Sequence, residues 1–197
     1  MKFQGLILDW DGVFHDGRKS SDGASSFSEI DSMGLNMLRY GYYRQYGKPL
    51  PVAIVTGERN PTAEAFAQRE HLDGFMYYAR DKRRAVPHLE QLWGSSPRDW
   101  GFVFDDILDL GLANDVGYRA MVQRPSTEQT QAYAKAQGLV DMWLPETLAV
   151  RHFAETVLAD LGIFDDCITS RIAYDANYQA YWEMRQSTPT LVHNLNP

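Results

Sequence analysis

The sequence predicts an α/β domain built on a doubly wound parallel sheet, and two observations support this prediction. First, short apolar runs recur along the chain without polar alternation, as in parallel strands that are buried on both faces. These runs are residues 5–9, 52–56, 74–78, 101–105 and 118–122, with 140–144 as a plausible sixth. Second, helix-like segments lie between the runs, and strands that alternate with helices form parallel sheets covered on both sides.

Three of the intervening segments carry helix signals, at residues 60–72, 126–138 and 146–162. In the first, Asn60 suits the N-cap and Pro61 the first turn. In the second, Ser126 and Gln129 have the spacing of a capping box. The third has an apolar stripe and ends at a glycine. We therefore expect helices at these three places.

The chain divides into a main domain, 1–163, and a C-terminal tail, 164–197. Residues 12–28 are rich in Gly, Ser and Asp and predict a β-hairpin flap after the first strand. In the tail, residues 174–186 have a helical pattern, and 187–197 predict a loose end. The aromatic tail is a candidate oligomer contact.

Composition excludes several classes of function. The 197 residues carry a formal net charge of −7, and the longest basic run is the triplet at 82–84, which argues against nucleic-acid binding. Cys167 is the only cysteine, so a disulfide framework and a thiolate zinc site are excluded within one chain. Because no apolar run is long enough for a signal peptide or a membrane span, we expect a soluble, cytoplasmic protein.

Polar residues follow four of the predicted strands, where parallel sheets bind their ligands. They are Asp9 and Asp11 after the first strand, Thr56 and Gly57 after the second, Lys82 after the third, and Asp105, Asp106 and Asp109 after the fourth. We expect them to converge on one crevice. Taken singly, each signal is as well explained by a turn or a surface residue, so the prediction depends on their order and their shared position.

These residue types suit phosphoryl transfer, in which positioning and charge stabilisation dominate. Asp9 could attack phosphorus and form an aspartyl-phosphate, while Asp11 protonates the leaving alkoxide and then deprotonates water. Thr56 and the Gly57 amide could donate hydrogen bonds to phosphate, and Lys82 supplies a positive charge. The acidic cluster, with Asp9, would hold Mg²⁺, and that cation would offset the two adjacent carboxylates.

Three other uses of such residues fit less well. An EF-hand loop that starts at Asp9 would need Gly and Glu where Phe14 and Ser20 stand. A prenyl-diphosphate enzyme uses a DDxxD pattern on long helices, whereas here the pattern follows a strand. A phosphoacceptor receiver domain places its acidic pair before the acceptor strand, whereas here the acidic cluster comes last. The order favours an enzyme.

The chain resembles the haloacid dehalogenase (HAD) superfamily over roughly residues 4 to 160, and more narrowly the 3-deoxy-D-manno-octulosonate 8-phosphate phosphatases. The matching stretches are LILDWDGVFHDG, FSEIDSMGLNML, AIVTGERN, RDKRRA, DDILDLGLANDVGYRAMV and LAVRHFAETVL. The resemblance implies a HAD-like Rossmannoid sheet without a large cap domain. It also implies a homo-oligomer, typically a homotetramer, in which the flap and the chain ends close the neighbour's site.

By resemblance, Asp9 is the nucleophile and Asp11 the general acid/base. The metal ligands are the carboxylates of Asp9 and Asp105 and the backbone carbonyl of Asp11. Also by resemblance, the phosphate is bound by Thr56, Gly57 and Lys82. Asp106 and Asp109 support the metal from nearby.

The chain departs from the family pattern at Phe104, where Gly is usual, at His15, where Thr is usual, and at Ile30, where Arg is usual. Phe104 is bulky enough to reshape the metal loop or to narrow the pocket. We conclude that the sequence predicts a Mg²⁺-dependent phosphomonoester hydrolase for a small phosphorylated metabolite, with a sugar-acid phosphate as the favoured class. The alternatives are an inactive binding or assembly module and a phosphotransferase to a sugar acceptor.

Overall fold

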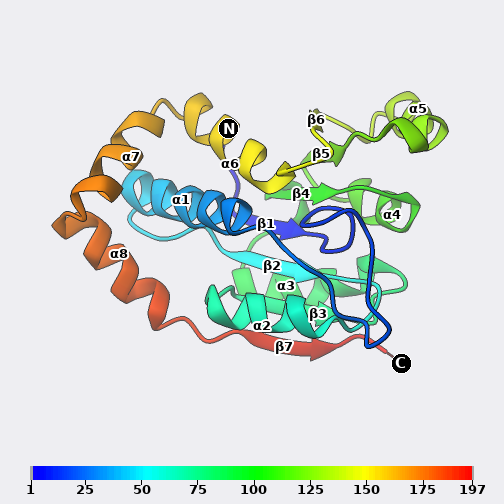
Figure 1. The fold of residues 1–197 in the computed structure, drawn as a ribbon, viewed down its shortest axis with the longest axis horizontal. Coiled ribbons are helices and arrows are strands. Elements are labelled where there is room, and N and C mark those ends of the chain that lie inside the picture. The colour runs from blue at the N-terminus through cyan, green and yellow to red at the C-terminus, as the bar shows by residue number, and fades with distance from the viewer. Residues whose placement is uncertain (1, 197) are drawn as a thin grey trace.

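The computed structural model describes residues 2–196 and confirms the predicted sheet (Figure 1). Seven parallel strands lie in the order β6-β5-β4-β1-β2-β3-β7. The strands are β1 (Gly5–Leu8), β2 (Val52–Val55), β3 (Gly74–Tyr77), β4 (Trp100–Phe104), β5 (Tyr118–Val122), β6 (Met142–Leu144) and β7 (Leu191–Asn194). β1 lies in the middle of the sheet, which places its carboxyl end between those of β2 and β4.

Helices cover both faces of the sheet (Figure 1). They are α1 (Glu29–Tyr46), α2 (Pro61–Arg69), α3 (Val86–Trp93), α4 (Leu110–Ala113), α5 (Glu128–Ala136), α6 (Ala149–Asp160), α7 (Phe164–Ala173) and α8 (Ala176–Gln186). Successive strand residues point to opposite faces. Leu6 and Leu8 therefore pack with α1 and α6 in one core, and Ile7 packs with α3 and α4 in the other.

The three predicted helices are confirmed, with shorter bounds. Asn60 caps α2, because its side chain accepts hydrogen bonds from the backbone N–H groups of Thr62 and Ala63. α6 begins only at Ala149, because Leu148 before it has a left-handed backbone with φ 55°. A short 3₁₀ turn, Pro125–Thr127, precedes α5. The capping signals therefore located the helices but set their ends only approximately.

The predicted β-hairpin flap is not confirmed, since residues 10–28 contain turns and no strand. We keep the name flap for residues 12–28. Gly12, Gly17 and Gly23 all have left-handed backbones. Local hydrogen bonds close the turns: Asp22 accepts from the Ser20 hydroxyl and from the Ala24 backbone N–H. These local bonds take the place of a strand ladder.

The tail packs against its own chain instead of ending loosely. α7 and α8 contact α1, and the buried Tyr181 donates a hydrogen bond from its hydroxyl to the Asn36 carbonyl. The expectation of a loose end at 187–197 is wrong for its central part, because β7 pairs with β3 and extends the sheet (Figure 1). Within residues 2–196 no helix has the length and apolar character that a membrane crossing requires. The oligomer contact stays a prediction.

Candidate active site

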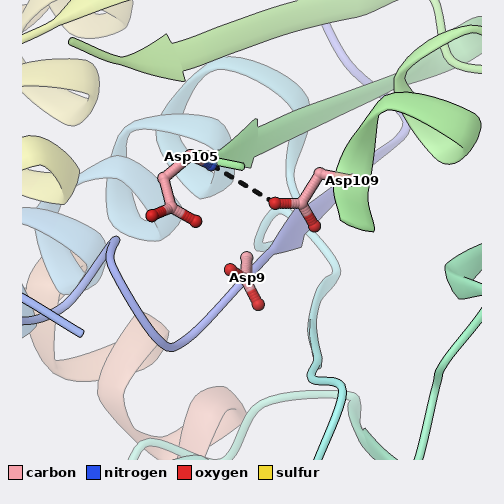
Figure 2. A group of neighbouring side chains, drawn as sticks. All are labelled: Asp9, Asp105 and Asp109. Atoms are coloured by element: carbon pink, nitrogen blue, oxygen red, sulfur yellow. Dashed lines mark hydrogen bonds between the residues drawn. The ribbon is translucent and has the colours of Figure 1, made fainter. Parts of the chain in front are cut away.

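Three carboxylates meet at the carboxyl ends of the central strands (Figure 2). Asp9 follows β1, Asp105 follows β4, and Asp109 lies in the turn after β4. Each contributes an oxygen, and these oxygens lie within 4.8 Å of one another. The Asp109 carboxylate is oriented by its own loop, because it accepts hydrogen bonds from the backbone N–H groups of Asp105 at 3.4 Å and Asp106 at 3.1 Å. We call Asp9, Asp105 and Asp109 the acidic group.

Lys82 places a buried ammonium against this group. Its Nζ lies 2.5 Å from Asp9 Oδ1 and also contacts Asp109 Oδ1, and the side chain is only 1% exposed. The lysine begins a 3₁₀ turn after β3, and the side chain of Asp81 caps that turn. Burial opposes the charge of Lys82, but Asp109 and Asp9 outweigh burial and raise its pKa. Lys82 is therefore a fixed cation at neutral pH.

Two cations, Lys82 and Arg124, do not offset three carboxylates in so buried a position. Burial raises the pKa of Asp9 well above its usual value; Lys82 opposes this, and the charges of Asp109 and Asp105 add to it. Burial and the Asp109 charge likewise raise the pKa of Asp105 to about 6, despite Arg124 and Lys82. The electrostatics of the site therefore favour a further cation.

Thr56 and Gly57 follow β2, which pairs with β1, the strand that precedes Asp9. The Thr56 side chain is fully buried, and its hydroxyl has no hydrogen-bond partner among residues 2–196. Because buried hydroxyls are nearly always paired, this one is suited to a polar ligand. At Gly57 an added Cβ would lie 2.8 Å from the Leu108 side chain. The backbone that follows β2 therefore lies close to the loop after β4, which carries Asp105 and Asp109.

Asp11 directly precedes the flap, and each of its carboxylate oxygens has a partner. His15 Nε2 lies 3.1 Å from Oδ1, and Lys19 Nζ lies 2.6 Å from Oδ2. Asn60, the cap of α2, is 3.5 Å from the same Oδ1. Burial would raise the pKa of Asp11, but the hydrogen bonds of His15 and Lys19 outweigh it and lower the pKa. From the sequence, His15 was noted only as a departure from the family pattern and Asn60 only as a helix N-cap, while Lys19 was missed.

Arg124 is a further residue that the sequence analysis missed. It follows β5, and its guanidinium donates to Asp105 Oδ2 at 2.9 Å and to the backbone carbonyl of Gly12. The sequence contains a signal for it, because Gln-Arg-Pro comes directly after the fifth apolar run, at the same edge of the sheet. The expectation that ligand sites lie at the carboxyl ends of parallel strands applies to this fifth strand as well as to the first four.

Two predicted features lie away from the centre. Asp106 is exposed and is not part of the acidic group; its backbone N–H donates to the Asp109 carboxylate at 3.1 Å. Phe104 is fully buried in the core beneath α3 and α4, where its ring stacks on Phe102 with centroids 5.0 Å apart. The expectation that Phe104 narrows the pocket is therefore wrong, because its side chain points into the core.

The donor set fits a hard divalent cation. The oxygens of the acidic group are close together, and carboxylate oxygens are the ligands that Mg²⁺ prefers. The excess negative charge beside Lys82 gives a cation a favourable position.

No model of a known protein family and no curated protein sequence matches the chain. Solved structures do match. The 3-deoxy-D-manno-octulosonate 8-phosphate phosphatase from Moraxella catarrhalis, in complex with magnesium, phosphate and KDO, is 25% identical, with 85% of this chain and 92% of that chain covered and a TM-score of 0.68. A protein from Legionella pneumophila described as a HAD superfamily (subfamily III A) hydrolase is 24% identical, with 87% and 90% covered and a TM-score of 0.69.

The cobalt-bound deoxy-D-mannose-octulosonate 8-phosphate phosphatase from Haemophilus influenzae is 21% identical, with 83% and 91% covered and a TM-score of 0.66. The chain thus has the fold of HAD hydrolases, including phosphatases of the group that the sequence resembles. The resemblance predicted from the motifs is confirmed at the level of the fold. The two phosphatase structures were solved with different divalent metals, magnesium and cobalt.

Proposed function

We propose that this chain is a Mg²⁺-dependent phosphomonoester hydrolase that acts through an aspartyl-phosphate on Asp9. One observation supports the proposal above all others: a buried carboxylate, Asp9, lies 2.5 Å from a buried ammonium and beside two further carboxylates. A purely structural cluster would gain nothing from the excess negative charge. A nucleophile that must attack a phosphate bound to a cation needs this arrangement.

In the first step an oxygen of ionised Asp9 attacks phosphorus, and the bond from phosphorus to the ester oxygen breaks. Asp11 gives its proton to the leaving alkoxide. In the second step Asp11 takes a proton from water, and that water attacks the phosphoryl group on Asp9, which releases inorganic phosphate and regenerates the carboxylate. The position of Asp11 two residues after Asp9 supports its role in both steps. Its flap partners His15 and Lys19 lower its pKa, which favours the base role in the second step, so the acid role in the first step requires these contacts to open.

The transferring phosphoryl group needs hydrogen-bond donors and positive charge around it. The Thr56 hydroxyl, which has no partner within residues 2–196, and the Gly57 amide would provide the donors. Lys82 would provide the fixed charge, since its ammonium already contacts the nucleophile.

The carboxylates of Asp9 and Asp105, with the backbone carbonyl of Asp11, would hold Mg²⁺, and Asp109 would support it from nearby. When bound, the metal supplies positive charge that neutralises the phosphate and the acidic group. Asp106 would act only through its loop, since its side chain lies outside the acidic group.

The substrate that we propose is a small phosphorylated metabolite, with sugar-acid phosphates as the first class to test. Support comes from the phosphatase structures that share the fold, one of which holds KDO, phosphate and magnesium. A homo-oligomer, in particular a homotetramer, and a cytoplasmic location remain predictions from the sequence.

The test is an assay of p-nitrophenyl phosphate with and without Mg²⁺, followed by a panel of phosphorylated sugars and sugar acids. We expect Mg²⁺-dependent release of phosphate, and a loss of at least about 10³-fold in Asp9→Asn, as expected when a nucleophile is removed. Asp16→Asn is the matched control, because Asp16 is an exposed carboxylate on the same flap and, among residues 2–196, its side chain pairs with neighbouring Arg18 alone. A folded Asp9→Asn variant with full activity would contradict the mechanism.

The structure favours neither alternative from the sequence. The inactive module was motivated by Phe104 and by the altered flap; Phe104 packs in the core and leaves the acidic group in place. Transfer to a sugar acceptor would be detected in the same assay, as a phosphorylated product when acceptor sugars are added.

A further inference from the structure

Arg124 joins two parts of the site that come from different segments of the chain. One guanidinium nitrogen donates to Asp105 Oδ2 at 2.9 Å, and the other donates to the carbonyl of Gly12, where the flap begins. The side chain is only about a tenth exposed. A planar guanidinium holds two acceptors with two separate nitrogens in one rigid fork, whereas an ammonium must reach both from a single nitrogen on a flexible stem.

Hydrogen bonds to the backbone carbonyl of Arg124 hold this residue in place. Its carbonyl accepts hydrogen bonds from the side chains of Gln131, in α5, and Thr127, in the turn before α5. Glu146, 3.8 Å from Nε, is a second and more exposed carboxylate beside the guanidinium. The arginine is thus oriented before any ligand binds.

The first residue of the flap, Gly12, also lies directly against the carboxylate of Asp105. Gly12 has a left-handed backbone with φ +89°, and an added Cβ would lie 1.9 Å from Asp105 Oδ2. Only glycine allows this approach. The guanidinium therefore closes a short link from the Asp105 carboxylate to the backbone of the residue that follows Asp11.

We propose that Arg124 is a positioning residue that couples the flap to the metal site, by holding the Asp105 carboxylate and the Gly12 carbonyl in one geometry. The coupling has two sides. With Arg124 in place, Asp105 is oriented for a cation and the flap is anchored at its first residue. Without it, Asp105 can rotate and the flap loses its anchor, so metal binding and flap order weaken together. The metal side of this inference rests on the proposed function, whereas the flap side does not.

A simpler role for Arg124 is to supply positive charge to the acidic group. The two roles give different expectations for Arg124→Lys, which keeps the charge but lacks the rigid fork of two nitrogens that fixes Asp105 relative to Gly12. If charge were the whole role, this variant would behave as the wild type. Arg124→Gln, which lacks the charge, would then bind Mg²⁺ more tightly, because a competing cation is gone.

The experiment measures Mg²⁺ binding by calorimetry and flap order by limited trypsin digestion of the metal-free protein. Trypsin can cut the flap after Arg18, whose side chain is 91% exposed. We expect Arg124→Lys and Arg124→Gln each to bind Mg²⁺ roughly tenfold more weakly, as for the loss of a partner that orients a metal ligand. We also expect both variants to be cut at Arg18 several-fold faster. Arg119→Gln, which removes an arginine of the same β5 region whose partners are Asp141 and the Gly138 carbonyl, should match the wild type in both measurements.

Wild-type behaviour of Arg124→Lys in both measurements would overturn the inference, as would tighter Mg²⁺ binding by Arg124→Gln. If Arg124→Gln does not fold, Arg124→Lys decides alone. If the wild type binds no Mg²⁺ and releases no phosphate, the proposed function fails. The trypsin arm still decides whether Arg124 anchors the flap, because it needs no metal.

Discussion

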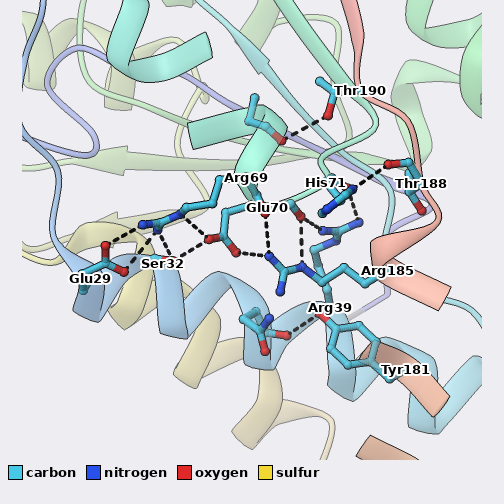
Figure 3. Close-up of polar contacts among 12 residues, drawn as sticks. Glu29, Ser32, Arg39, Arg69, Glu70, His71, Tyr181, Arg185, Thr188 and Thr190 are labelled. Carbon is cyan, nitrogen blue, oxygen red and sulfur yellow. Dashed lines mark hydrogen bonds and ion pairs between the residues drawn. The ribbon is translucent and has the colours of Figure 1, made fainter. Parts of the chain in front are cut away.

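Two buried clusters of charge lie on the same fold and have opposite character. The first is the acidic group with Lys82 (Figure 2). The second, the Glu70 cluster, comprises Arg39, Arg69, Glu70 and Arg185 and joins α1, the end of α2 and α8 (Figure 3). In both, carboxylates and cations lie within hydrogen-bond distance, and most of the charged groups are buried, with Arg69 the more exposed member of the Glu70 cluster. They differ in how completely each charge is satisfied.

In the Glu70 cluster every carboxylate oxygen has a partner. Arg69 Nε donates to Glu70 Oε1 at 2.9 Å, and Arg185 Nη2 donates to Oε2 at 2.7 Å. Arg39 uses its donors on backbone carbonyls at the end of α2, including that of His71 at 2.9 Å (Figure 3). The cluster thereby ties the C-terminal tail to the main domain. A buried charge network satisfied in this way holds elements together.

The acidic group has no such balance. Burial and mutual repulsion raise the pKa values of Asp9 and Asp105, and Thr56 keeps a buried hydroxyl without a partner in residues 2–196. The comparison teaches that burial of charge does not itself mark a functional site. An incomplete set of partners does. Changes in the two clusters should therefore have opposite consequences for stability and activity.

The largest effect on stability is expected for Glu70→Gln. Removal of this carboxylate charge leaves the buried guanidinium of Arg185 without its ionic partner, which costs about 3–5 kcal/mol of unfolding free energy. The measurement is urea denaturation followed by circular dichroism. At a temperature at which the variant is folded, its phosphatase activity should match the wild type, because no Glu70 contact reaches the acidic group.

Glu64→Gln is the matched control on the same helix. Glu64 pairs with Arg59 at 3.0 Å, and the arginine side chain is 52% exposed. Exposed pairs contribute at most about 1 kcal/mol. If Glu70→Gln lowers the unfolding free energy no more than Glu64→Gln does, then the Glu70 cluster does not stabilise the packing of the tail on the main domain as its hydrogen bonds indicate.

The next largest expected effect is the increase in unfolding free energy when Mg²⁺ binds. A ligand that binds only the folded state at a hundred times its Kd stabilises the protein by about 2.7 kcal/mol. We expect this increase in the wild type and also in Glu70→Gln, since the Glu70→Gln substitution leaves the acidic group intact. Asp105→Asn, which removes a proposed ligand, should lose most of it. A similar gain in Asp105→Asn, measured by thermal unfolding with and without Mg²⁺, would place the metal elsewhere.

Thr56→Val separates activity from stability at a single atom. Because the buried hydroxyl has no partner within residues 2–196, its replacement by a methyl group should leave the unfolding free energy unchanged or raise it by up to about 1 kcal/mol. Loss of a hydrogen bond to a charged phosphate costs about 2 kcal/mol, or about thirtyfold in kcat/KM. Thr56→Ser keeps the hydroxyl and should retain most of the activity. Equal kcat/KM in the valine variant would remove Thr56 from the site.

Much of the sheet and the acidic group could be predicted because both follow from local patterns. A buried parallel strand is a short apolar run, and its carboxyl end determines where Asp9 and Asp105 lie. The direction of Phe104 also follows from strand alternation, since it shares a face with Phe102, but the analysis considered only its size.

Other features depend on contacts between distant segments, which local patterns do not contain. β7 has four residues and follows Thr188-Pro189-Thr190; it forms a strand because the path of α7 and α8 brings it to the free edge of β3. The turns of the flap likewise depend on how Gly12 meets Asp105. The link from Arg124 to Gly12 spans more than half of the chain and appears only once the fold is known.

The smallest predicted effect tests the comparison most directly, because its sign is opposite to that of Glu70→Gln. Asp9→Asn removes a carboxylate that is destabilised by burial and by Asp109, while Lys82 keeps Asp109 as its partner. We expect the metal-free variant to be more stable than the wild type by about 1 kcal/mol, which raises Tm by about 2–4 °C for a domain of this size. Calorimetry without Mg²⁺ measures the shift. A lower Tm would mean that the Asp9–Lys82 pair stabilises the fold as the Glu70 cluster does, and the distinction between the two clusters would then have to rest on catalysis alone.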